Sequence, residues 1–128
     1  MKTRRILKER LFKMVNWMNI KSKIKSLLRE TVIDFVQGDF NKIQAKLQKG
    51  LSISDLKEEL SYWDSLTIPP DAAYENVDFY KYDDGSGYAL EFELWIDNQR
   101  SDLTLSCEAL IDEYNNIRAF TVENLHVL

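Results

Sequence analysis

The apolar residues of this chain change their spacing once, at a pair of prolines, and this change constrains the fold more than any other feature. Before Pro69 and Pro70 they recur at helical intervals of about 3.6 residues. After the prolines they alternate with polar residues, which indicates strands buried on one face. Consecutive prolines end a helix because each lacks an amide donor and restricts the residue before it. We therefore expect helices first and a sheet after them.

The helical half is predicted to contain about four helices. Gly38 provides a stop for the second helix, Asp39 a cap for the third, and Ser52 or Ser54 a cap for the fourth. We place these helices at residues 3–18, 20–37, about 40–49 and about 54–65.

The second half is predicted to contain four strands joined by short polar turns, which favour an antiparallel meander. We place the strands at residues 77–82, 88–97, 103–109 and 117–127, with Cys107 buried as an unreactive thiol. The fold class is α+β, with about four helices packed on one face of a four-stranded antiparallel β-meander. We expect one domain over residues 1–128: a basic helical extension at 1–17, a helical part at 18–66 and a sheet at 77–128.

Charge is divided unevenly along the chain. Residues 1–50 carry 13 basic and 4 acidic residues, a net of +9, while residues 51–128 carry 4 basic and 17 acidic residues, a net of −13. Such asymmetry concerns partners and association rates more than fold. The two halves could attract each other, the acidic half could face a basic partner, or the basic half could meet nucleic acid or an anionic membrane. The first 50 residues have the charge for nucleic acid but none of its recognition motifs, so no direct nucleic-acid binding is expected.

Several classes of protein do not fit this composition. One cysteine allows no intrachain disulfide, and one histidine with one cysteine provides too few ligands for a zinc site. No apolar run is long enough to span a membrane. The opening has no secretory pattern, so we expect a cytoplasmic location. We expect no cofactor and no metal, and Met1, Met14 and Met18 are each a possible start.

Glu91, Glu93 and Asp97 share one face of the clearest predicted strand with Trp95. A solvated sheet face is the simplest interpretation. However, an aromatic side chain among carboxylates is also typical of a binding surface, because aromatic residues anchor partners and acidic residues steer basic ones. Tyr80 and Tyr82 on the neighbouring strand extend this predicted partner-binding face.

A second polar group contains Arg100 and Asp102, and we expect Arg100 to be paired with Asp102, Glu91 or Asp97 as a structural cluster. The functional alternative is a clamp for a carboxylate or phosphate. His126, the only histidine, is interpreted as a structural hydrogen-bonding residue.

One resemblance rests on the run Arg100-Ser101-Asp102-Leu103-Thr104-Leu105 and the ending His126-Val127-Leu128, preceded by Ile68-Pro69-Pro70. These motifs resemble a family of small uncharacterised bacterial domains over roughly residues 20–128. In size, charge and architecture the chain is also similar to immunity proteins of contact-dependent growth inhibition and related polymorphic toxin systems.

The second resemblance implies a function without catalysis. The chain is expected to bind and neutralise a cognate toxin domain, a basic nuclease, through its acidic and aromatic surface. The alternative is a small-molecule-binding or enzymatic α+β cone whose pocket lies near Arg100, Asp102 and His126. The sequence leaves the oligomeric state open.

Overall fold

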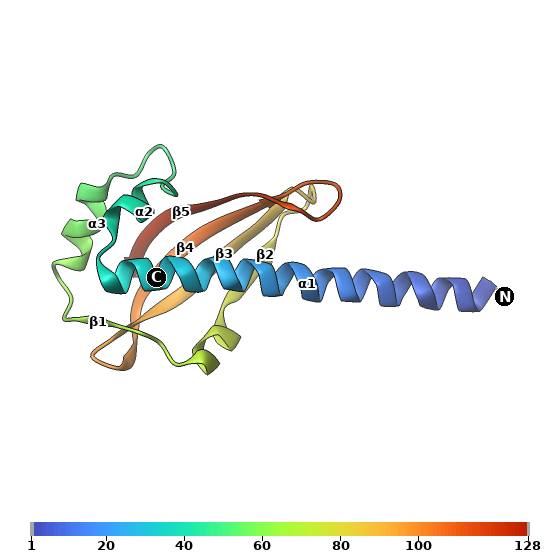
Figure 1. Cartoon of the computed structure of the whole chain (residues 1–128), viewed down its shortest axis with the longest axis horizontal. Helices are drawn as coiled ribbons and strands as arrows, with labels where there is room; N and C mark the ends of the chain where they lie inside the picture. Colours follow the sequence, from blue (N-terminus) through green and yellow to red (C-terminus); the bar gives the residue numbers. More distant parts are fainter. Residues whose placement is uncertain (1, 128) are drawn as a thin grey trace.

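The computed structural model describes the backbone of residues 2–127 and the side chains of residues 19–127. This part of the chain contains four helices and an open antiparallel sheet of five strands, an α+β fold (Figure 1). In chain order the elements are α1 (Lys2–Gln37), α2 (Phe40–Gln44), α3 (Ile53–Leu60), β1 (Leu66–Thr67), the 3₁₀ helix η1 (Asp71–Asn76), β2 (Asp78–Lys81), β3 (Gly87–Ile96), β4 (Gln99–Ile111) and β5 (Ile117–Val127).

The first two predicted helices are one continuous helix of 36 residues. The prediction of a break near residue 19 was wrong. Residues 2–37 contain no glycine or proline that would interrupt the hydrogen bonds of the helix. The apolar stripe expected within residues 3–18 belongs to side chains outside the described set.

The predicted end of this helix is confirmed. Gly38 has a φ of +69°, and the amide of Asp39 donates to the carbonyl of Asp34 at 2.9 Å. This left-handed residue with a backbone bond reaching five positions back closes the last turn of α1. Asp39 then caps α2 by accepting from the amide of Lys42.

Helices α2 and α3 are both shorter than expected, and for α2 the reason is tertiary pairing of its expected last residues. Helix α2 stops at Gln44, and the backbone on either side of Leu47 exchanges hydrogen bonds with Val122 of β5. Helix α3 begins after Ser52, which forms a reciprocal capping box with Asp55. It stops at Leu60, and the chain goes on to form β1, a short strand that the sequence did not predict.

The sheet is built around β3 and β4. Strands β1 and β2 both pair with the same edge of β3, and β5 pairs with the far side of β4. Four predicted strands are therefore present, with β1 as an addition. The tight turn between β3 and β4 contains Asp97 and Asn98, both at positive φ, as in a two-residue hairpin loop.

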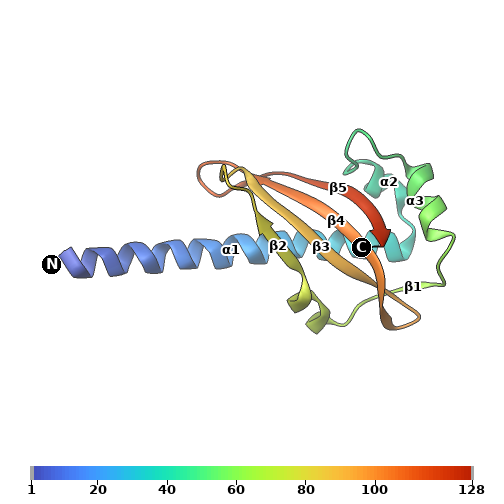
Figure 2. The same ribbon diagram turned by 180° about the vertical axis from the view of Figure 1, so that it is seen from behind.

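Helix α1 crosses one face of the sheet, while α2 and α3 lie at one end, beside β5 (Figures 1 and 2). One helix, α1, therefore covers most of the sheet face that about four helices were expected to cover. Its buried residues include Ile20, Ile24, Leu28 and Val32, which recur every four positions. They meet the apolar face of β3 and β4, where Leu90, Phe92, Leu103 and Leu105 are buried.

None of the described helices is long and apolar enough to cross a membrane. The N-terminal turns of α1 extend past the end of the sheet (Figures 1 and 2).

Candidate binding face

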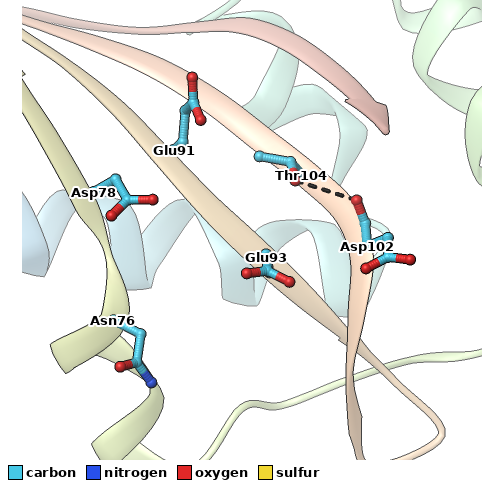
Figure 3. A pocket seen from close by; sticks show the side chains of 6 residues that line it. All are labelled: Asn76, Asp78, Glu91, Glu93, Asp102 and Thr104. Atoms are coloured by element: carbon cyan, nitrogen blue, oxygen red, sulfur yellow. Dashed lines mark hydrogen bonds between the residues drawn. The ribbon is translucent and has the colours of Figure 1, made fainter. Parts of the chain in front are cut away.

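The sheet has an inner face, covered by α1, and an outer face turned away from that helix (Figure 3). Residues paired across antiparallel strands point to the same face. The register thus places Asp78 beside Glu91, and Glu93 beside Thr104. Strands β2, β3 and β4 each turn acidic side chains outward, so carboxylates from three strands lie together on the outer face.

These side chains line an open hollow of about 200 Å³ (Figure 3). We call it the acidic hollow; its lining residues are Asn76, Asp78, Glu91, Glu93, Asp102 and Thr104. Four of the six side chains are carboxylates. Thr104 forms the floor, since it is only 2% exposed, and its hydroxyl donates to the backbone carbonyl of Asp102 at 3.2 Å.

A shift in strand register places Asp102 beside the hollow. Between the pairs Glu93–Thr104 and Trp95–Arg100, Leu94 of β3 stands opposite three residues of β4, Ser101 to Leu103. Such a bulge bends the strand and redirects its side chains. The Ser101 hydroxyl stabilises the bulge by donating to the Leu94 carbonyl at 2.7 Å and accepting from the Leu103 amide at 3.2 Å.

Arg100 is paired with Glu93, its Nε lying 3.9 Å from Oε2 of the carboxylate. The partners expected from the sequence, Asp102, Glu91 and Asp97, are not the ones that pair with it. The register sets Arg100 of β4 opposite Trp95 of β3. Glu93 is two residues before Trp95 on β3, and its side chain is therefore within reach of Arg100. Both side chains are about half exposed, so solvent weakens this pair. The hollow therefore keeps a strong excess of negative charge.

The tyrosines predicted for this face lie in different surroundings. Tyr80 is 51% exposed, and the negative charges of Glu91 and Asp78 raise the pKa of its phenol. The hydroxyl of Tyr82 donates to Glu108 at 2.7 Å. Burial, followed by this bond, raises the pKa of Tyr82 to about 12. Tyr80 is thus the accessible aromatic residue beside the acidic hollow.

Trp95 is not the exposed aromatic residue that the alternation suggested. It is partly buried and packs against the core, since Thr67 of β1 pairs with it and η1 lies nearby. Its indole Nε1 is buried and has no hydrogen-bond partner in the described part of the chain. Asp97 lies in the hairpin turn and does not line the hollow.

Neither His126 nor Cys107 lines the hollow: His126 lies on the outer face beside Thr104, and Cys107 lies on the inner face. The register places His126 opposite Thr104, and its Nε2 lies 2.9 Å from the Ser106 hydroxyl. The thiol of Cys107 is on the inner face, 2% exposed, and burial raises its pKa. Of the three residues in the pocket alternative, only Asp102 lines the acidic hollow.

The sequence analysis missed three lining residues: Asn76, Asp78 and Thr104. Alternation already placed Thr104 on the polar side of its strand. Asn76 and Asp78 required knowledge of the β2–β3 register, which a single sequence does not provide. Within the part of the chain that is described, no three His, Cys, Asp or Glu side chains are grouped to hold a metal ion.

The chain belongs to a family of domains of unknown function, DUF7668, which matches residues 32–128. The match covers the sheet, the acidic hollow and the last turns of α1. No curated protein matches the chain, and no solved structure does.

Proposed function

We propose that this protein is a binding module that acts as an immunity protein in the bacterial cytoplasm, neutralising a cognate toxin domain without catalysing a reaction. The supporting observation is the acidic hollow, in which four carboxylates from three strands surround a concave surface. Carboxylates in this arrangement accept hydrogen bonds from lysine and arginine side chains, and charge-assisted bonds of this kind are the stronger ones.

The chemistry of the outer face favours a basic partner. A nuclease toxin carries positive charge where it binds phosphate, so an acidic face would be attracted to that surface and would compete with its substrate. Tyr80, exposed beside the carboxylates, adds an amphipathic contact. The toxin partner is a basic protein domain whose lysine or arginine side chain enters the acidic hollow.

The first test uses tagged full-length protein, expressed in its own bacterium and purified at low and moderate salt. We expect one basic toxin fragment in near-equal amount. Co-expression of that fragment in a tester strain should stop growth, and this protein should restore it. Failure to bind or to protect when the toxin is shown to be present would overturn the proposal.

Charge reversal then locates the interface. Glu93→Lys should slow association with the toxin roughly tenfold and reduce its dependence on ionic strength, because electrostatic steering sets the association rate. Glu58→Lys changes the charge equally but lies on α3, away from the hollow, and serves as the matched control. Equal rates for the two variants would remove this face from the proposal. Loss of function only at Arg100 and Asp102 would favour a ligand pocket instead.

A further inference from the structure

The N-terminal segment of α1 carries a charge opposite to that of the outer face. Residues 2–18 include six basic residues and one acidic residue, a net of +5. This segment lies outside the family match, which begins at residue 32, and its helical turns extend past the end of the sheet (Figures 1 and 2). It is therefore a basic segment of α1 outside the matched part of the chain, which is acidic.

This segment cannot reach the acidic hollow of its own chain. Helix α1 crosses the inner face and continues away from the sheet, whereas the hollow opens on the outer face (Figures 1 and 3). Residues 2–18 can therefore contact an acidic hollow only in another molecule.

Residues 2–18 form a helix long enough to cover Glu91 and Glu93, the two acidic residues that β3 contributes to the hollow. A helix of residues 2–18 is about 26 Å long at a rise of about 1.5 Å per residue. Strand β3 has ten residues, and at about 3.3 Å per residue a strand of that length spans about 33 Å. A helix of this length can lie along the outer face and place basic side chains over the row from Glu93 to Asp78.

We propose that residues 2–18 of one molecule dock on the outer face of a second copy of this chain, with basic side chains in the acidic hollow. The contact joins two different surfaces, so the first molecule keeps a free outer face and the second keeps a free helix, and each can bind a further neighbour. Association of this type forms a closed ring if successive molecules return to the first one, and an open chain if they do not. Opposite charges make it strongest at low salt.

The first test measures the mass of the purified full-length protein by light scattering over a wide range of concentration. At low salt the mass should rise with concentration. It should either pass that of a dimer, for an open chain, or level off at the mass of a closed ring. At about 1 M salt, where the Debye length is only about 3 Å, it should return to that of a monomer. A monomer under all conditions would overturn the proposal. So would association that high salt leaves unchanged.

Two charge-reversed variants supply a complementation test. Lys8→Glu with Arg10→Glu lowers the net charge of residues 2–18 from +5 to +1. Glu91→Lys with Glu93→Lys brings the four charged positions of the acidic hollow from −4 to 0. Each variant alone should associate at least about tenfold more weakly than the parent, because every contact then includes one surface that has lost most of its charge. A mixture of the two should associate again, since the unchanged helix of the face variant meets the unchanged outer face of the helix variant. A mixture that stays monomeric would overturn the proposal.

The control variant, Glu58→Lys with Glu113→Lys, changes the net charge as much as the face variant but at exposed sites on α3 and in the β4–β5 turn. It should associate as the parent does. Circular dichroism checks that all variants are folded, and the milder Glu91→Gln with Glu93→Gln replaces the face variant if that one is not.

Anionic vesicles of phosphatidylglycerol test whether residues 2–18 bind a membrane surface and not a second copy of the chain. Co-sedimentation of the parent with these vesicles, combined with no self-association, would assign residues 2–18 to a membrane surface and overturn the proposal. Because self-association is measured on the purified protein alone, its outcome is independent of whether a toxin binds the same face.

Discussion

The Ser101 hydroxyl lies 2.7 Å from the Leu94 carbonyl oxygen and donates a hydrogen bond to it across the bulge of β3 and β4. The hydroxyl oxygen of Ser101 also accepts from the amide of Leu103, so one side chain satisfies two backbone groups that the bulge removes from the ladder. It thereby fixes the register that sets Asp102 beside the acidic hollow. The bond connects the strand geometry to the candidate binding face.

Ser101→Ala should lower the free energy of unfolding by about 1–3 kcal/mol, because it leaves a partly buried carbonyl and amide without their partner. Urea unfolding followed by circular dichroism measures the loss. Ser101→Thr keeps the hydroxyl and should cost less. If the alanine variant is as stable as the parent, the hydroxyl does not hold the bulge.

The sequence predicted the sheet better than the helices, for a physical reason. Alternation depends on one face of a strand being buried, and the positions of Leu90, Leu105 and Glu93 follow directly from it. The length of α2 instead depends on the pairing of Leu47 with Val122, 75 residues away along the chain. No local pattern records such a contact, and tertiary pairing overrides helix propensity there.

The candidate site shows the same division. Glu91 and Glu93 were placed on the outer face from alternation alone, whereas the burial of Trp95 results from its pairing with β1, a two-residue strand with no local signal. The role of Ser101 was also hidden, since a bulge is a property of two strands and not of one.

Gly87 lies where no side chain fits. A β-carbon built there would stand 2.1 Å from the carbonyl oxygen of Ala109 on the neighbouring strand. Gly87→Ala should therefore push β3 away from β4 and lower the free energy of unfolding by about 3 kcal/mol or more. Gly85→Ala, in the same turn, meets no atom within 4 Å and bears only the strain of its φ of +75°, so it should cost about 1 kcal/mol. Urea unfolding compares the two variants, and equal losses would contradict the contact with Ala109.

Tyr82 should ionise at a higher pH than an ordinary tyrosine. Burial and the hydrogen bond to Glu108 raise its pKa to about 12 from an ordinary value of 10.0. Because the folded state holds this proton more tightly, its contribution to stability is complete below about pH 10 and is lost as the pH rises toward about 12. The difference in tyrosinate absorbance between the parent and Tyr82→Phe isolates this titration.

Removal of the bond partner should lower that pKa only in part. Glu108→Gln removes a negative charge beside the phenol but leaves the burial, which is the largest cause of the shift. The titration should therefore move toward 10.0 without reaching it. A pKa that stays unchanged in this variant would contradict the role of Glu108.

Cys107 should be inert in the folded protein. Its thiol lies on the inner face between Leu90 and Val122, which pair with it on either side, and burial raises its pKa so that little thiolate forms at neutral pH. A thiol reagent should modify it at the rate of unfolding, and immediately in denaturant. The introduced thiol of Ser54→Cys, at an exposed position of α3, is the matched control and should react at once in the folded state. If Cys107 reacts as fast as that exposed thiol, the inner face opens without unfolding and the packing of α1 over the sheet is looser than its buried residues indicate.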